Sequence, residues 1–266
     1  MRFIPVIALL AAFVAPAYAG PPPADDQAAP VDAPPFGTPD PGWSADPGFV
    51  VRVRPAHLGA KRYVVDALPI VEIHYGDQLQ LSLNDGAKYS ALRGKSWAIG
   101  PVAEYRQSFT DDLPRGARDV DDAIEVGGFA SYRLPFGEVE GRLRKAVTGY
   151  RGWSGDLSFD TGTKVGPKWI VGAEARVAWA DSNFTNDYFG LRPGAAHRIG
   201  LPRFLENDFW TAGGELGVAR RIGPHMQFVV SISEDRILGP IGHTPLLRSR
   251  DLASFALGVT YHFSAH

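Results

Sequence analysis

The chain has 266 residues, with 27 lysines and arginines against 29 aspartates and glutamates, and it has no cysteine. Without cysteine there is no disulfide framework, no Cys-ligated zinc site and no catalytic thiol, and the near-balance of charge argues against a nucleic-acid binder. The mean hydropathy of -0.10 resembles that of a soluble protein, but it also fits a membrane β-barrel, in which apolar and polar residues alternate.

The first residues have the pattern of an export signal. Arg2 precedes a mostly apolar stretch over residues 4–14, and residues 17–19 (Ala-Tyr-Ala) match a small-x-small cleavage site. We therefore expect a cleaved signal peptide over residues 1–19. Residues 20–48 are rich in Pro, Ala, Asp and Gly, which predicts an extended periplasmic linker; an interaction tail would have the same composition.

From residue 49 to residue 266 the chain shows the period-two alternation of β-strands. In residues 255–263 every second side chain is apolar, and in residues 169–179 the apolar face has a Trp at each end, as a bilayer interface selects. Many segments run for ten to thirteen residues. Soluble strands average about five to six residues and membrane-spanning strands need about nine to eleven, so the length predicts an antiparallel transmembrane β-barrel.

The connections between these strands predict their number. Asn84-Asp85-Gly86 is a hairpin signal that splits residues 78–93 into two short strands, which gives twelve strands and places both chain ends in the periplasm. Ten strands, with residues 49–57 outside the barrel, is the alternative. Short connections alternate with long ones, as in outer-membrane barrels. The short ones fall at 135–137, 166–167 and 223–224, and the long ones at 111–122, 149–155, 181–208 and 238–251.

The strand faces opposite the apolar ones carry charges of both signs, which in a membrane barrel point into the lumen. These charges either form salt bridges that plug a narrow barrel or line a small, weakly selective pore. The candidate lumen residues are Glu104, Arg106, Glu125, Arg133, Glu140, Arg142, Arg144, Glu174, Arg176 and Glu215.

We expect no catalytic, metal or cofactor site. Residues 152–155 (Gly-Trp-Ser-Gly) fail the nucleophile-turn pattern because Asp156 stands where its last glycine should be, so we expect a loop with a Trp anchor there. The seven histidines do not form the helical i, i+4 pair of a zinc site, because the one pair with that spacing, His262 and His266, follows a strand pattern and not a helical one; His74 and His262 fall on inward faces. The acidic segment 111–122 lacks the ligand pattern of an EF-hand loop, which favours a solvated outer loop.

Four stretches carry a more specific signal: Val53–Gly59 (VRPAHLG), Leu81–Gly86 (LSLNDG), Asp112–Phe129 and Gly258–Phe263 (GVTYHF). Together they resemble the MipA/OmpV family of outer-membrane proteins, the first name standing for MltA-interacting protein. The resemblance covers about residues 49–263, which is nearly all of the chain after the linker. It implies a β-barrel in the outer membrane of a Gram-negative bacterium, without an established catalytic activity.

The resemblance also implies partners. Some family members are described as scaffolds that bring a lytic transglycosylase and a penicillin-binding protein together for murein growth. We expect this non-enzymatic role, with a small porin-like channel for polar solutes as the alternative and an outer-membrane enzyme or adhesin as weaker ones. Implied contacts are outer-membrane lipid, lipopolysaccharide and the barrel-assembly machinery, which recognises terminal aromatic residues, here Tyr261 and Phe263.

Overall fold

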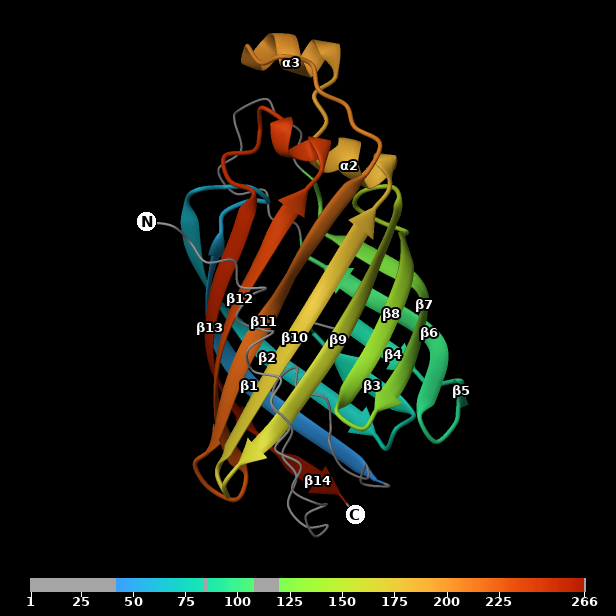
Figure 1. Cartoon of the computed structure of the whole chain (residues 1–266), viewed down its shortest axis with the longest axis vertical. Coiled ribbons are helices and arrows are strands. Elements are labelled where there is room, and N and C mark those ends of the chain that lie inside the picture. The colour runs from blue at the N-terminus through green and yellow to red at the C-terminus, as the bar shows by residue number, and fades with distance from the viewer. Residues whose placement is uncertain (1–41, 84–85, 108–119, 266) are drawn as a thin grey trace.

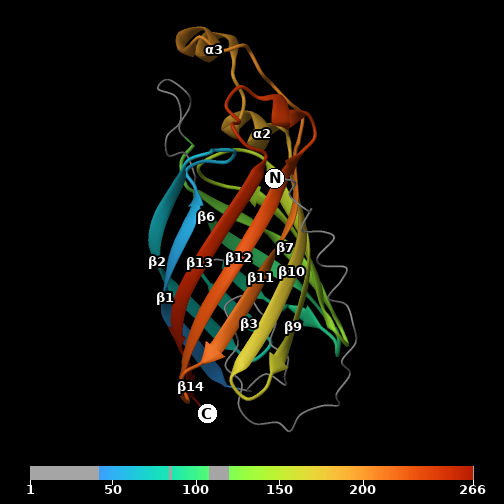
Figure 2. The ribbon, with the colours of Figure 1, turned by 60° about the vertical axis from the view of Figure 1, so that its left-hand side comes forward.

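The structure, a computed structural model, describes residues 42–83, 86–107 and 120–265. The expected signal peptide and most of the expected linker lie outside the described residues. The described residues form a closed antiparallel β-barrel of twelve strands whose longest loops gather at one end (Figures 1 and 2). Neighbours in sequence pair along the wall, and β13 pairs with β1 to close the ring.

Ten long strands and four short ones make up the sheet. The long strands are β1 (Trp43–Pro55), β2 (Tyr63–Tyr75), β6 (Trp97–Arg106), β7 (Ala123–Leu134), β8 (Gly137–Ala146), β9 (Trp153–Val165), β10 (Trp169–Ala180), β11 (Phe209–Arg221), β12 (Met226–Leu238) and β13 (Asp251–Tyr261). The short strands are β3 (Leu79–Ser82), β4 (Gly86–Tyr89), β5 (Leu92–Arg93) and β14 (Phe263–Ala265).

The predicted count of twelve strands is confirmed. Strands β3 and β4 flank the Asn84-Asp85-Gly86 hairpin signal, so the split of residues 78–93 holds. Strand β14 continues β13 beyond a break at His262 and pairs with the same neighbour, β1, so the two count as one. Strand β5 is a short arm that pairs with β6 alone.

The barrel begins earlier in the chain than expected. Residues 43–48, which the composition assigned to the linker, form the first part of β1 and pair with β2 and β14. The outward side of this part carries Trp43, Ala45 and Pro47, which extends the alternation of the barrel into the Pro-rich stretch. Pro47 is tolerated because it lies opposite the break between β13 and β14, where the ladder needs no N–H donor.

The strands alternate between an apolar outer surface and a polar interior. Phe49 and Leu157 are half-exposed on the outside, as a lipid-facing side chain is in the absence of lipid, and Trp169 and Trp153 stand near opposite ends of this surface. The residues that alternate with these along each strand, such as Arg52, point inward and are partly or wholly buried. The alternation found in the sequence therefore gives the two faces of the wall.

The two ends of the barrel differ. The terminal end holds the start of β1, the end of β14 and the predicted short turns, whereas the loop end holds the long loops (Figure 1). The loop between β10 and β11 forms two helices that alternation did not predict, α2 (Ser182–Tyr188) and α3 (Pro193–Ile199). The loop between β12 and β13 contains a 3-10 turn, η1 (Pro240–His243). Within the described part of the chain, every helix is too short or too polar to cross a bilayer.

The β3–β4 hairpin is shorter than the other strands of the wall and covers only its terminal-end part. It pairs with β2 only at residues 72–75, apart from a bond from the Leu83 N–H to the Val71 carbonyl. Among the described residues, the part of β2 nearer the loop end, residues 63–70, has β1 as its one strand neighbour. Pro69 has the same parity as Val71, so its nitrogen faces that open edge, where a residue without an N–H donor costs no ladder bond.

Close approach of two strands gives a first prediction. At Gly127 of β7, an added Cβ atom would collide with the carbonyl oxygen of Leu143 in β8. We expect Gly127→Ala to lower the urea midpoint of the refolded barrel, because overpacking of this kind typically costs about 1–3 kcal/mol. Gly141→Ala is the control, since its Cβ would meet its nearest atom, on Leu157, at 3.7 Å. Equal midpoints for the two variants would contradict the register of β7 and β8.

Candidate functional site: the lumen and its lid

The structure places the ten candidate lumen residues on the inward face of their strands. Glu104 stands opposite Glu125 in the β6–β7 register, and Glu174 stands opposite Glu215 in the β10–β11 register. Their ion pairs reach strands that are not adjacent in the wall, such as β6 with β8 and β10 with β12, which requires a shared concave interior. Nine of the ten lie in the belts described below; Arg133 is near the terminal end, 43% exposed and 3.6 Å from Glu138.

Glu125 is the centre of the larger belt. Its side chain is fully buried and lies 3.0 Å from the Arg106 guanidinium and 3.2 Å from that of Arg144. The Ser154 hydroxyl donates to its Oε1 at 2.9 Å, and the Tyr150 hydroxyl donates to the same oxygen. A carboxylate without water is stable only when its charge and lone pairs are satisfied in this way.

The belt extends from Glu125 around the β6–β9 wall. Arg144 Nη1 lies 2.7 Å from Glu104, and Arg142 Nε lies 2.6 Å from Glu140. Lys88 of β4 lies 3.2 Å from Glu140 of β8, so this ion pair spans the lumen side of two intervening strands. Charges on β4, β6, β7, β8 and β9 thus neutralise one another across the interior.

A second belt lies on β10 to β12. Arg176 holds Asp235 through two bonds, from Nε at 2.9 Å and from Nη2 at 2.5 Å, and it donates to Glu174 at 3.0 Å. This forked geometry is the strongest arrangement that a guanidinium and a carboxylate can make. Glu215 stands beside Glu174 in the same layer.

Sequence reasoning missed three members of these belts. Asp156 pairs with Arg144 and Asp235 pairs with Arg176, although neither acid was among the candidates. Each is two residues from an inward serine on its own strand, Ser158 for Asp156 and Ser233 for Asp235. Strict alternation would therefore have placed both acids on the inward face. Lys88 sits on a four-residue strand, which is too short for a periodic pattern to be recognised.

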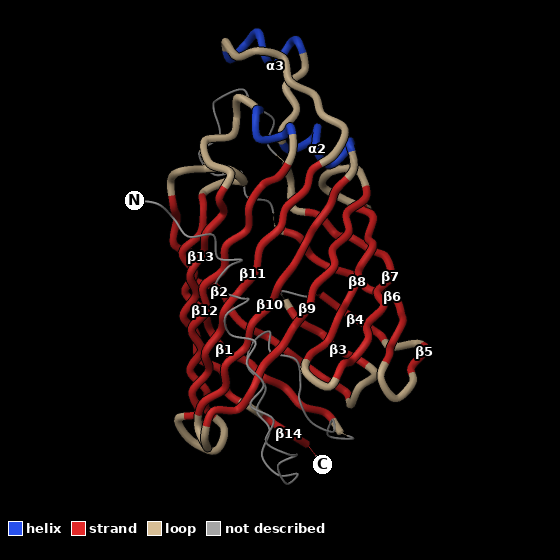
Figure 3. The backbone as a smooth tube through the Cα atoms, in the orientation of Figure 1, coloured by secondary structure: helices blue, strands red, loops and turns tan. Residues whose placement is uncertain are grey.

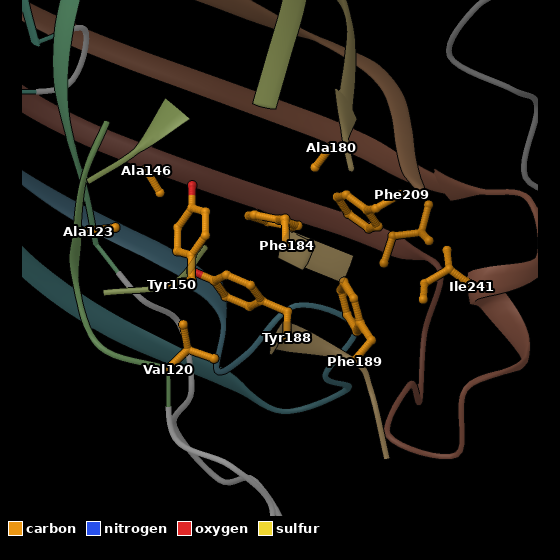
Figure 4. Close-up of a cluster of buried hydrophobic side chains, with 11 residues drawn as sticks. Val120, Ala123, Ala146, Tyr150, Ala180, Phe184, Tyr188, Phe189, Phe209 and Ile241 are labelled. Atoms are coloured by element: carbon orange, nitrogen blue, oxygen red, sulfur yellow. The ribbon is translucent and has the colours of Figure 1, made fainter. Parts of the chain in front are cut away.

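An aromatic lid covers the loop end of the lumen. We define the lid as Tyr150, Phe184, Tyr188, Phe189 and Phe209, which form one buried cluster (Figure 4). Phe184 packs edge-on against Tyr150 at 4.9 Å and stacks on Tyr188 at 4.5 Å between ring centroids. Phe209 begins β11, and around the lid lie inward-facing residues from the loop-end tips of four further strands: Ala123, Ala146, Ala180 and Ile237.

Helix α2 holds the lid in place. The Asp181 side chain caps the helix by accepting from the N–H groups of Asn183 and Phe184 at 3.0 Å and 3.1 Å. Thr244, from the loop that carries η1, donates to the Phe189 carbonyl. Burial raises the pKa of the Tyr188 hydroxyl to about 12, so this side chain stays neutral in the lid.

The lid and the larger belt are joined. The Tyr150 hydroxyl donates to Glu125, and the Arg106 guanidinium lies 6.0 Å from the centre of the Phe184 ring. The charges of the belt, which lie beneath the apolar lid, are paired with one another. An ion-selective pore, in contrast, is lined by a ring of charges of one sign that faces water. The arrangement therefore pairs the inward charges with one another and ties the loop end to the wall.

The remaining sequence predictions have mixed outcomes. Residues 153–155, expected in a loop, begin β9, and Ser154 bonds to Glu125 inside the barrel. His262 lies 2.8 Å from Asp46, and the inward His74 lies 3.7 Å from Glu72 rather than against His262. Most of the acidic segment 111–122 lies outside the described residues.

The two expected assembly-signal residues stand on either side of the break that follows β13. Tyr261 ends β13 and Phe263 begins β14, with their ring centroids 4.5 Å apart. Both rings are exposed on the outer surface at the terminal end. Their role in barrel assembly stays a prediction.

Removal of one belt cation gives a second prediction. Arg144 is 4% exposed and pairs with Glu104, Glu125 and Asp156, so Arg144→Met removes one cationic partner from the fully buried Glu125 and from two partly buried carboxylates. We expect a loss of about 3–5 kcal/mol in the free energy of unfolding, measured by urea titration of the refolded barrel.

The matched control is Arg236→Met. Arg236 pairs with Asp251 at 3.0 Å on the outer surface, where both side chains are at least half-exposed, and such pairs contribute about 0–1 kcal/mol. A similar stability for the Arg144 variant and the Arg236 variant would contradict the buried belt.

Comparison with known proteins bears on the identity of this barrel. The chain is 25% identical over 162 residues to the Escherichia coli (strain K12) protein named "Putative outer membrane protein YiaT", a match that covers 60% of this chain and 65% of the relative. The match therefore spans less than two thirds of the relative's length.

Solved barrels are similar at a lower level. The NanC porin covers 83% of this chain and 99% of its own, with 10% identity and a TM-score of 0.41. The COG4313 outer membrane channel from Pseudomonas putida F1 covers 92% of this chain and 100% of its own, with 11% identity and a TM-score of 0.40. Similarities at this level say nothing about activity.

The family is shown by a stronger match. The family model described as MltA-interacting protein MipA matches residues 48–263, which takes in the barrel from the middle of β1 to the start of β14. This range agrees with the extent of the resemblance seen in the sequence, and the barrel architecture agrees with an outer-membrane location. The chain thus belongs to the MipA family of outer-membrane β-barrels.

Proposed function

We propose that this protein is a non-enzymatic scaffold of the outer membrane, which binds murein enzymes at its terminal end. The observation that carries the proposal is the joined lid and ion belts. Paired charges occupy the interior of the barrel, and an aromatic cluster closes its loop end. We therefore expect partners to bind at the two rims of the barrel and not in its lumen.

The terminal end has a surface that suits a protein partner. The arm formed by β5 and its turn, residues 91–95, is fully exposed and stands out from the wall (Figures 1 and 3). It carries Arg93 and Lys95, and the turn between β9 and β10 adds Lys168. These cations suit an acidic patch on a partner, because complementary charge at an interface speeds association and fixes orientation.

The family description supports the choice of partner. It names an interaction with MltA, and in this family that enzyme is a lytic transglycosylase. If the terminal end faces the periplasm, as in barrels with short turns on that side, the basic arm lies where a murein enzyme works. A penicillin-binding protein is the second partner that the family role implies.

The experiment measures binding directly. The refolded mature chain is immobilised in lipid nanodiscs, and the lytic transglycosylase of the same organism is passed over it by surface plasmon resonance. We expect the double variant Arg93→Glu/Lys95→Glu to weaken binding about tenfold, or about 1.4 kcal/mol, with most of the loss in the association rate.

The control reverses two cations at the other end. Lys61→Glu/Arg198→Glu changes exposed residues of the loop end and should leave the affinity unchanged. No binding by the unmodified chain, or an equal loss in the control, would overturn the proposal. Reproducible ion conduction by the folded barrel would favour the small channel instead.

A further inference from the structure

A pocket of about 480 Å³ lies at the loop end, outside the lumen. Its walls come from α2, from the start of α3, from the chain that returns towards β11 and from the loop before β9 (Figure 2 shows the two helices). It is separate from the terminal-end surface proposed to bind a partner. The volume falls in the range of about 300–1,000 Å³ typical of small-molecule sites.

The pocket has an excess of positive charge. Arg151, Arg192 and Arg203 line it, with Asp187 as the one carboxylate among its lining residues. Asp187 lies 3.7 Å from Arg151, whereas neither Arg192 nor Arg203 forms an ion pair within the described part of the chain. Two guanidinium groups therefore remain available to a ligand, in contrast to the arginines of the lumen belts, which are all paired.

The walls are fixed before any ligand binds. Asp187 is almost fully buried and accepts from the Arg151 N–H at 3.1 Å, which fastens the loop before β9 to α2. Asn186 donates to the Glu206 carbonyl at 2.8 Å and accepts from the Glu206 N–H at 3.1 Å. A pocket held in this way spends little ordering entropy on binding.

The return chain is fastened a second time. Leu191 and Phe204 form a two-bond antiparallel bridge, at 2.7 Å and 3.1 Å. Arg192 directly follows Leu191 and Arg203 directly precedes Phe204, so the bridge places these two arginines opposite each other, one residue beyond it. Their spacing is thus determined by main-chain hydrogen bonds rather than by flexible loops.

We propose that this pocket binds a phosphorylated sugar. Guanidinium groups match the oxygens of a phosphate through paired hydrogen bonds, and Asn183 and Ser182 add neutral polar groups suited to hydroxyls. Pro193 and Leu205 supply apolar surface on which the carbon face of a sugar ring packs. A bare phosphate would leave most of the volume empty.

Phosphorylated sugars occur as free solutes and as part of membrane-anchored lipopolysaccharide, and the experiment distinguishes these two sources. Isothermal titration calorimetry of the refolded chain uses glucose 6-phosphate, glucose and inorganic phosphate at equal ionic strength. A second series uses detergent-dispersed lipopolysaccharide before and after removal of its phosphates. Binding of glucose 6-phosphate supports a free ligand, and binding of phosphorylated lipopolysaccharide alone supports a lipid-anchored one. Binding of inorganic phosphate as tight as that of glucose 6-phosphate, or no binding in either series, overturns the proposal.

Variants place the binding in the pocket. Arg192→Gln/Arg203→Gln should weaken binding at least tenfold while the barrel keeps its heat-modifiable mobility on gels. Lys61→Gln/Arg198→Gln removes two loop-end cations that do not line the pocket and should leave affinity unchanged. An equal loss in both variants would show attraction to the general charge of the loop end and would contradict the site.

Discussion

The buried carboxylate of Glu125 is the interaction on which the rest of the interior depends. It joins Arg106 and Arg144 of the ion belt to Ser154 of β9 and to Tyr150 of the lid. A charge removed from water must be paired and hydrogen-bonded, so the groups around it are held in one arrangement. One residue thereby connects the wall, the ion belt in the lumen and the aromatic lid at the loop end.

This constraint divides the molecule by role. The outer surface is apolar and contacts lipid, whereas the charged side chains of the inner surface pair with one another. Since neither surface is accessible to a soluble partner, we expect such a partner to bind at one of the two ends of the barrel. The terminal end presents the short turns and the basic β5 arm, whereas the loop end presents the arginine pocket beside α2.

The wall could be predicted from the sequence because period-two alternation sets which side chains face lipid and which face the lumen. It placed Glu104 and Arg176 inward, and the hairpin signal at residues 84–86 gave the strand count. The belts themselves could not be predicted, since pairs such as Lys88 with Glu140 depend on curvature that brings distant strands together.

The loop end was the least predictable part. Helices α2 and α3 have seven residues each, too few for a helical period to stand out from a long loop. The aromatic lid arises from three separate segments, and no spacing along the chain links Tyr150 with Phe209. Composition places the start of β1 too late in the chain because prolines argue against a strand, whereas Pro47 occupies a position that needs no N–H donor.

The central claim is that the interior is closed, and single-channel recording of the refolded chain in a planar bilayer tests it most directly. Protein shown to be folded by its heat-modifiable mobility should give no reproducible open steps if the lid and the paired charges of the belts close the lumen, as proposed. Steady open steps whose conductance changes when Arg176 is replaced by Glu would contradict the claim and show that the lumen conducts.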